Sequence, residues 1–323
     1  MMVTILIVRL SSLGDIVHTY PMIRDIKANL NNCTIDWLVD ENFAELVKLN
    51  QLVDKVISIP LRKWKKDKLK FFTKFLHWKK IIKNKRYDYI IDAQGLLKSA
   101  LLAKCFKGNI YGFNKNSIRE KLACLFYQYK FEAGKNCLAT TKNRLLAKAI
   151  FNYTIDIQTV DFGLTKHVLP QLEQLTQNYI IFFHATSRES KKYPAQSWAQ
   201  LGRYLITEHN LTIILPFGSD LEHEESLFIA NLINSSKVYV PPVKFSYAEL
   251  SSLISHARFV FGVDTGLIHL ANAFNKKLIA IYIDTDPSKT GIFESAMAKN
   301  IGNKNIFPNT DQIIKVFEEI LKV

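Results

Sequence analysis

The sequence predicts an α/β protein of two domains, each with a parallel sheet that helices cover on both faces. Short, nearly continuous apolar runs alternate with longer helical patterns, which is typical of parallel strands buried between layers of helices. The series of runs starts again after a polar stretch around 163–178. The chain has 323 residues, more than one hydrophobic core usually holds, so two domains of similar size are expected.

The expected strands are short runs that are rich in β-branched and aromatic side chains. In the first half they are 3–8, 35–39, 55–59, 88–92 and 109–113, and in the second half they are 179–184, 211–216, 237–240, 258–262 and 277–283. These runs place an N-terminal domain at 1–165 and a C-terminal domain at 176–308. The remaining residues, 309–323, are expected to form a helix that can pack back on the N-terminal domain.

Composition disfavours several classes of protein. No stretch approaches 18 apolar residues, so no membrane-spanning helix is expected, and the apolar start lacks the basic flank of a signal peptide. The four cysteines are widely spaced without a CxxC pair, which disfavours a disulfide framework and a zinc site. The net charge of +14 favours an anionic partner, whether nucleic acid, an anionic membrane or a phosphorylated substrate.

Most of this charge lies in one segment, from Arg62 to Arg86. The segment holds twelve Lys or Arg and a single acid, Asp67, a local charge of +11. Apolar residues at spacings of four, three and four would share one helix face, with most lysines elsewhere: Phe71, Phe75, Trp78 and Ile82, against Lys70, Lys74 and Lys80. This pattern fits a core-facing stripe with a solvated basic back, and it equally fits a surface that meets anionic lipid.

The loop after the first expected strand, SSLGD at 11–15, is the first candidate site. Loops at the carboxyl ends of parallel strands face the ligand crevice of such sheets. Gly14 permits a positive φ or a close backbone approach, and Asp15 is placed to take a proton. Alternatively, Asp15 only caps the helix that follows. The glycine fingerprint of dinucleotide-binding loops is absent here, which disfavours an oxidoreductase.

Four expected strand ends of the second half carry polar groups. The run Asp264-Thr265-Gly266 precedes a helix, whose N-terminal N–H groups and dipole favour an anion. The loop 184–194 supplies hydroxyls and Lys191, and GSD at 218–220 and TDP at 285–287 end two further strands. Helix capping and ordinary polar loops explain the same residues. Together they outline a nucleotide-diphosphate site without a DxD pair of metal-binding carboxylates.

Five motifs carry a resemblance to a known family. They are RLSSLGDIVHT at 9–19, DAQGLLKSA at 92–100, HAT at 184–186, VDTGLIH at 263–269 and TDP at 285–287. In this order, through nearly the whole chain, they resemble the ADP-heptose:lipopolysaccharide heptosyltransferases. The run RKWKK at 62–66 is also similar to the basic motif of that family. The amino-acid sequences of these motifs are more similar to the first type of heptosyltransferase in this family than to the second.

The resemblance implies a GT-B fold, in which two Rossmann-like domains with parallel sheets face a central cleft. The N-terminal domain would bind the acceptor and the C-terminal domain ADP-heptose. The implied reaction is the inverting transfer of L-glycero-D-manno-heptose from ADP-heptose to Kdo of Kdo2-lipid A, in synthesis of the lipopolysaccharide inner core. No metal or other cofactor is expected. The implied place is the cytoplasm, at the anionic cytoplasmic face of the inner membrane, and nucleic acid is not an expected partner.

Carried over by position, the resemblance makes Asp15 the general base that takes the proton of the acceptor hydroxyl. The residues assigned to diphosphate, heptose or ribose of the donor are Thr186, Ser187, Lys191, Glu222, Asp264, Thr265, Gly266 and His269, with Glu224 or Glu225 as alternatives to Glu222. The residues assigned to the acidic acceptor are Ser12, Gly14, Arg62, Lys63, Gln94, Lys98 and Arg119. The chain departs from the family at Tyr193, where tryptophan is usual, and at Lys63, which lacks the bidentate recognition of the usual arginine.

Other functions remain open at this stage. Within the enzymes these are the second type of heptosyltransferase and any other GT-B glycosyltransferase. Outside them, a basic protein that binds a membrane surface or nucleic acid on a nucleotide-binding scaffold has the same charge. Such a binding protein has no need of Asp15.

Overall fold

A computed structural model of the chain describes residues 2–66, 71–82, 85–134, 137–164, 178–186 and 188–323. The chain divides into two compact units, Met1–Leu164 and Thr165–Val323, and each is described here by itself. Among the described residues, no helix combines the length and the apolar character that crossing a membrane requires.

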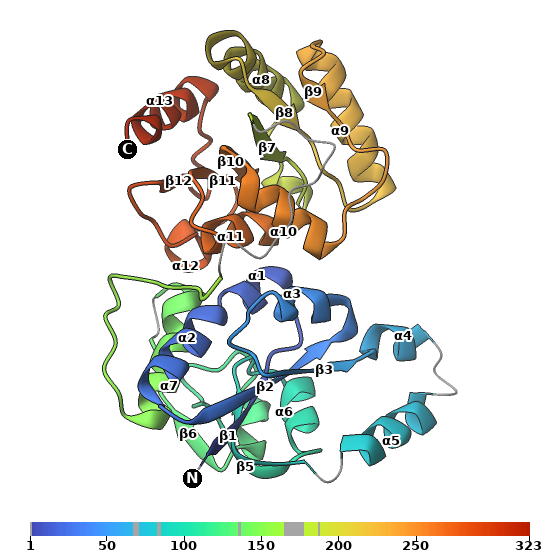
Figure 1. Cartoon of the computed structure of the whole chain (residues 1–323), viewed down its shortest axis with the longest axis vertical. Coiled ribbons are helices and arrows are strands. Elements are labelled where there is room, and N and C mark those ends of the chain that lie inside the picture. The colour runs from blue at the N-terminus through green and yellow to red at the C-terminus, as the bar shows by residue number, and fades with distance from the viewer. Residues whose placement is uncertain (1, 67–70, 83–84, 135–136, 165–177, 187) are drawn as a thin grey trace. The chain divides into compact units, whose positions relative to one another are not determined.

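The first unit is a six-stranded parallel sheet in the order β3-β2-β1-β4-β5-β6 (Figure 1). Its strands are β1 (Val3–Val8), β2 (Cys33–Asp40), β3 (Lys55–Ile59), β4 (Arg86–Asp92), β5 (Lys107–Phe113) and β6 (Tyr129–Phe131). Its helices are α1 (Leu13–Val17), α2 (Tyr20–Asn29), α3 (Ala44–Lys48), α4 (Leu61–Lys66), α5 (Phe71–Ile82), α6 (Leu97–Ala103) and α7 (Ala139–Phe151), with short 3-10 turns η1 (Glu41–Phe43) and η2 (Lys121–Phe126).

The second unit repeats this winding in a parallel sheet of order β12-β11-β10-β7-β8-β9. Its strands are β7 (Tyr179–Phe183), β8 (Thr212–Ile214), β9 (Val238–Tyr239), β10 (Phe259–Val263), β11 (Leu278–Tyr282) and β12 (Ala298–Gly302). Its helices are η4 (Glu189–Lys191), α8 (Ala195–His209), α9 (Asp220–Ile233), α10 (Tyr247–His256), α11 (Gly266–Ala273), α12 (Pro287–Thr290) and α13 (Thr310–Leu321).

The predicted fold class is confirmed, and each of the ten expected strands is found within a few residues of its expected bounds. Strands β6 and β12, each at one edge of its sheet, were not predicted. β6 has only three residues, and β12 reads AKNIG, with polar and small residues in place of an apolar run. An edge strand is buried on fewer sides, so its sequence carries a weaker apolar signal.

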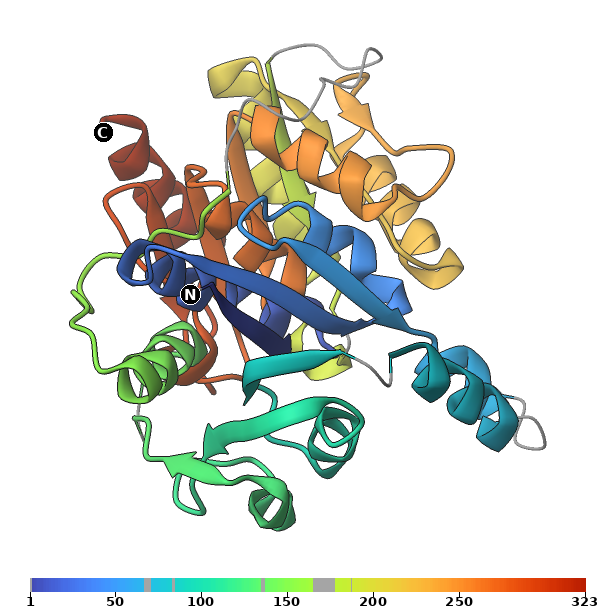
Figure 2. The same cartoon turned by 60° about the horizontal axis from the view of Figure 1, so that its bottom comes forward.

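Alternation along the strands of the first sheet buries both of its faces. Leu6, Val8 and Ile90 pack in one core with residues of α5 and α6. On the other side, the Tyr20 ring of α2 meets the Trp37 ring of β2 edge to face, at 6.0 Å between centroids. Figures 1 and 2 show these helices on either side of the strands. Both sheets therefore expose mainly their strand ends to ligands.

Helix α5 confirms the core-facing reading of the basic segment. Trp78 and Ile82 are buried in the first core, and Phe75 packs partly against them, whereas Lys79 and Lys80 are exposed. Lys70 and the Phe71 side chain lie outside the described residues. Three further apolar side chains of this helix, Phe72, Leu76 and Ile81, are exposed beside the lysines. The core reading therefore accounts for one face of α5 and leaves the others unexplained.

Helix α13 packs within the second unit. It contacts α8, β11 and β12, and the predicted contact of segment 309–323 with the N-terminal domain stays a prediction. Ile313, Phe317 and Ile320 bury one face of this helix in the core around Phe259 and Phe261. The apolar face of this amphipathic helix thus covers the core of its own unit.

Both sheets reverse their strand order at a central pair, β1 with β4 in the first and β7 with β10 in the second. In open α/β sheets, ligands bind outside the carboxyl ends of the strands at this switch point. The motifs at 9–19 and 92–100 follow β1 and β4, and those at 184–186 and 263–269 follow β7 and β10. The fold therefore brings the predicted motifs together in pairs, one pair in each unit.

Candidate functional site

Asp15 lies in the first turn of α1, directly after the loop that leaves β1. Its Oδ2 accepts hydrogen bonds from the backbone N of Ser12 at 3.1 Å and from the Ser12 Oγ at 3.2 Å. The capping alternative is thus partly right, because Asp15 closes a capping box with Ser12. Within the described part of the chain, the Asp15 Oδ1 accepts no hydrogen bond. One oxygen fixes the side chain and the other is available to a proton.

Of the two roles predicted for Gly14, the structure contradicts one, and the other, a close backbone approach to a ligand, stays a prediction. Gly14 lies inside α1 with helical backbone, so the positive φ that was considered for it is wrong. In the loop after β4, Gly95 does adopt a positive φ, at +68°. A side chain at Gly95 would also stand 2.9 Å from Ile118, so this position requires glycine on two counts.

Gln94 joins the two loops at the switch point of the first sheet. Its Oε1 accepts from the backbone N of Leu10 at 2.8 Å, and its Nε2 donates to the backbone O of Ser11 at 3.2 Å. The side chain is only 7% exposed, so its amide is committed to the loop that carries Asp15. The structure therefore gives Gln94 a positioning role, and its predicted contact with the acceptor stays a prediction.

Behind Gln94, a buried carboxylate holds the second loop. Asp92 accepts from Tyr127 Oη at 2.6 Å and Ser99 Oγ at 2.9 Å, and from the backbone N of Gln94 and Gly95 at 3.0 and 3.1 Å. Burial raises the pKa of the Asp92 carboxyl, while these four hydrogen bonds lower it. Sequence reasoning missed this network, since its partner Tyr127 stands 35 residues away.

Arg9 anchors the same loop from the other side. The side chain is buried, and its Nε donates to Thr19 Oγ1 at 3.2 Å. That hydroxyl donates in turn to the backbone O of Asp15 at 2.9 Å. Burial lowers the pKa of the Arg9 guanidinium, and the nearby carboxylates of Asp15 and Asp92 raise it. A buried positive charge therefore lies close to the candidate base.

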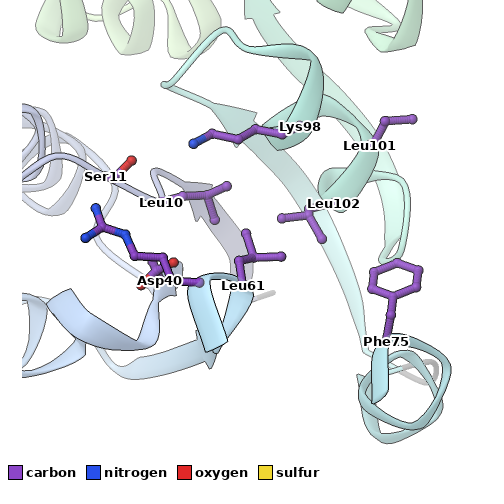
Figure 3. Close-up of a pocket in the computed structure, with 9 residues that line it drawn as sticks. Leu10, Ser11, Asp40, Leu61, Phe75, Lys98, Leu101 and Leu102 are labelled. Atoms are coloured by element: carbon purple, nitrogen blue, oxygen red, sulfur yellow. The ribbon is translucent and has the colours of Figure 1, made fainter. Parts of the chain in front are cut away.

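The predicted acceptor-binding cations differ in how they are placed. Arg62, Lys98 and Arg119 are exposed, and Arg62 and Lys98 line one pocket together with Ser11 (Figure 3). Lys63 lies outside that pocket and forms an ion pair with Glu41. Arg119 is close enough to Arg9 to influence its charge. The structure thus gathers Arg62 and Lys98 beside the loop that leads to Asp15, and it pairs Lys63 with Glu41.

In the second unit, Asp264 is the centre of a cluster at the switch point. Its Oδ2 accepts from Lys191 Nζ at 2.6 Å and from Thr285 Oγ1 at 2.8 Å, and its backbone O accepts from Thr186 Oγ1 at 3.0 Å. These residues follow β7, β10 and β11, which are neighbours in the sheet. The structure therefore brings together three predicted donor residues, and the lysine supplies the positive charge that a diphosphate needs.

Thr285 is a member of this cluster to which sequence analysis assigned no role. The signal was present, because the TDP motif at 285–287 follows an expected strand. What the sequence lacked was the order of the strands, since only the pairing of β11 with β10 brings Thr285 to Asp264.

Helix α11 begins beside the same cluster. Thr265 is its N-cap residue and Gly266 its first residue. The eight residues of this helix point the positive end of their dipole toward the strand ends, which suits a phosphate group. His269 is buried within the helix, and its predicted contact with the donor stays a prediction.

Two of the three glutamates in the acidic run on α9 form contacts within the second unit. Glu222 accepts a hydrogen bond from the backbone N of Gly218 at 2.6 Å, and Glu225 forms an ion pair with Lys192 at 3.0 Å. Glu224 is exposed. The structure therefore does not choose among the three for the ribose. Ser187 lies outside the described residues, so its predicted role is also not tested.

Tyr193 and His184 are buried at the edge of this site. Tyr193 packs edge to face on Trp198, at 5.4 Å between centroids, and fills the core where the resembled family usually has tryptophan. His184 follows β7, and its Nε2 lies 2.8 Å from Ser226 Oγ. Burial lowers the pKa of His184 to about 4, so its imidazole is neutral at physiological pH.

Comparison with known proteins identifies the family. The family model described as glycosyltransferase family 9 (heptosyltransferase) matches residues 75–313. Lipopolysaccharide heptosyltransferase 1 of Escherichia coli K12 is 33% identical over 290 residues, which cover 89% of this chain and 90% of that protein. The chain belongs to glycosyltransferase family 9. It is therefore a glycosyltransferase, and the non-enzymatic alternatives are set aside.

The solved structures of the family agree with this assignment. E. coli heptosyltransferase WaaC with ADP superposes with a TM-score of 0.89 and 30% identity, over 98% of this chain and 99% of that one. WaaC with ADP-2-deoxy-2-fluoro heptose gives 0.86 over the same shares. The predicted GT-B fold of this family 9 member is thereby confirmed.

Proposed function

We propose that this family 9 enzyme transfers L-glycero-D-manno-heptose from ADP-heptose to Kdo of Kdo2-lipid A, with inversion at the anomeric carbon. The similarity that extends over 89% of the chain to a lipopolysaccharide heptosyltransferase 1 carries this proposal. The likeness to WaaC with an ADP-heptose analogue supports the choice of donor. The exposed cations of the first unit support an acidic acceptor, since Kdo carries a carboxylate.

The chemistry can be assigned to side chains of this chain. Asp15 accepts the proton of the acceptor hydroxyl as the hydroxyl oxygen forms its bond to the anomeric carbon of heptose. The bond from that carbon to the phosphate oxygen breaks, and ADP leaves with the electron pair. Lys191 and the N-terminus of α11 stabilise the charge that develops on the diphosphate. For Lys191 to do so, it exchanges its contact with Asp264, at 2.6 Å, for one with phosphate.

An assay of the purified protein tests this function. We expect ADP release from ADP-heptose only when a Kdo-containing acceptor is present, and a product whose mass has increased by one heptose. De-acylated Kdo2-lipid A serves as the acceptor, and the same acceptor already carrying one heptose distinguishes the second type of heptosyltransferase. Turnover of the heptosylated acceptor alone would assign the chain to that second type.

We propose that the reaction needs no metal ion. Among the described residues, no group of three or more His, Cys, Asp or Glu is placed to hold one. Lys191 and the dipole of α11 offer the leaving group the positive charge that a divalent cation supplies in other transferases. We therefore expect unchanged ADP release in excess EDTA. Abolition of turnover by EDTA, with rescue by magnesium, would contradict this.

We further propose that the enzyme acts at the cytoplasmic face of the inner membrane, with α5 facing anionic lipid. Phe72 and Leu76 are exposed on this helix together with Lys79 and Lys80. Apolar side chains beside lysines are typical of helices that lie in the membrane interface. Nucleic acid is not among the partners that we propose, and a gel shift with mixed oligonucleotides is the direct check.

Reversing the charge of Lys79 and Lys80 tests the membrane contact. Each basic residue near an anionic surface contributes about 1 kcal/mol, so the double Lys→Glu variant should bind anionic vesicles at least tenfold more weakly. Lys299 and Lys304, two lysines of the second unit, changed to Glu provide a control with the same change in net charge. Equal loss in both variants would indicate a response to net charge alone and would argue against α5 as the contact.

A further inference from the structure

The first unit contains a pocket of about 380 Å³ whose apolar part has no role in the proposed chemistry. Its walls come from the loop after β1, the end of β2, α4, α5 and α6. The size lies within the range of small-molecule sites, about 300–1,000 Å³. Five of the nine lining side chains are leucine or phenylalanine at positions 61, 75, 101, 102 and 10, and the others are Ser11, Asp40, Arg62 and Lys98.

The polar and apolar parts of this lining are separated. Figure 3 shows Ser11 and the nitrogen of Lys98 toward one end, with Phe75 and Leu101 toward the other. Asp40 adds a carboxylate, but it is buried, and its Oδ1 already accepts from the backbone N and the Nδ2 of Asn42. The polar end therefore offers positive charge beside the loop of Asp15, and the rest offers hydrocarbon.

The apolar end is open to the outside. Leu101 is 49% exposed although it lines the pocket, and Leu61 and Phe75 are half-buried, whereas Leu10 and Leu102 form a buried floor. Apolar side chains that surround an open pocket stay in contact with water until a ligand covers them. A sugar, which is covered with hydroxyl groups, would leave the hydroxyls at this end without hydrogen-bond partners.

We propose that this pocket receives hydrocarbon of the lipid part of the acceptor, while its anionic sugar end lies at Arg62 and Lys98. The inference rests on the proposed function, which supplies a lipid-linked acidic acceptor. Charge and polarity match along the pocket: an anionic amphiphile needs cations at one end and hydrocarbon at the other. The lipid part then selects the acceptor and directs its hydroxyl toward the loop that carries Asp15.

Two acceptors that differ only in their acyl chains test the proposal. ADP release is measured with Kdo2-lipid A diluted in neutral detergent micelles, which keeps the surface charge low, and with its de-acylated form in solution. The test variant is Leu101→Asn. The control is Leu227→Asn on α9 of the second unit, a leucine with a similar exposure of 44%. Because both leucines are half exposed, neither change removes a core residue, and melting curves check the fold.

We expect Leu101→Asn to raise the KM for the acylated acceptor about tenfold, as expected when a leucine-sized apolar contact is lost. The KM for the de-acylated acceptor and the kcat for both should stay at the wild-type level, as should all values of the control. An equal loss on both acceptors, or none on either, would overturn the pocket as a lipid site. No ADP release from the wild type with either acceptor would overturn the proposed function itself, and this inference with it.

Discussion

Replacing Asp15 by Asn should lower kcat about 10²–10⁴-fold, the usual contribution of general-base catalysis. An alcohol is a poor nucleophile, and the amide of Asn cannot accept its proton. The variant keeps the shape of Asp15 and can still accept the hydrogen bond from the backbone N of Ser12, now at 3.1 Å. Loss of the negative charge in the first turn of α1 costs about 0.3–1 kcal/mol, so the melting temperature should fall by a few degrees at most.

A second capping box provides the matched control for Asp15. In α10, Glu249 Oε2 accepts from the backbone N of Ser246 at 2.7 Å, which is the arrangement that Asp15 forms with Ser12. Glu249→Gln removes the same charge from the same cap position, on a helix of the other unit. Turnover, the KM for ADP-heptose and thermal melting are compared for both variants. If Asp15→Asn keeps near-normal turnover, Asp15 is a cap and not the base.

Replacing Lys191 by Ala should lower kcat about 10²–10³-fold, the effect of losing one group that stabilises developing charge. The KM for ADP-heptose should rise as well, because the ammonium meets the diphosphate before and during bond cleavage. The KM for the acceptor should stay unchanged. Asp264 keeps Thr285 as a partner at 2.8 Å, so the cost in folding free energy is about 1–3 kcal/mol.

The control for Lys191 is an ion pair of similar length in the other unit. Lys27 Nζ lies 2.7 Å from Asp54 Oδ2, against 2.6 Å between Lys191 and Asp264. Lys27→Ala should change stability without changing kcat. Kinetics are measured well below the melting temperature of each variant. If Lys191→Ala raises only the acceptor KM, the lysine does not serve the donor, and the diphosphate site lies elsewhere in the unit.

The apolar runs were sufficient to predict the sheets, because parallel strands buried on both faces are uniformly apolar. They were insufficient for β6 and β12, where burial is partial, and for the packing of α13, since an amphipathic pattern shows that a helix packs but not against which core. The same distinction applies to α5: the spacing of Phe75, Trp78 and Ile82 predicted its buried stripe, whereas the exposure of Phe72 required the structure.

For the candidate site, the sequence indicated which strand ends carry chemistry, but not which side chains the fold itself uses. Gln94 follows a strand as predicted, yet its amide holds the neighbouring loop. Glu222 holds Gly218, and Lys63 pairs with Glu41. A polar residue in a motif has several possible partners, and only the three-dimensional neighbourhood decides among them. Thr285 is the opposite case. Its hydrogen bond to Asp264 could be recognised only once the order of the strands was known.

The identical winding of the two sheets has an evolutionary meaning. A half-chain that was duplicated and fused would leave this pattern, with the reversal of strand order at the same place in each copy. Each copy then owns a ligand-binding edge and a core of its own, closed in the second copy by α13. Loops of one copy can diverge without disturbing the other.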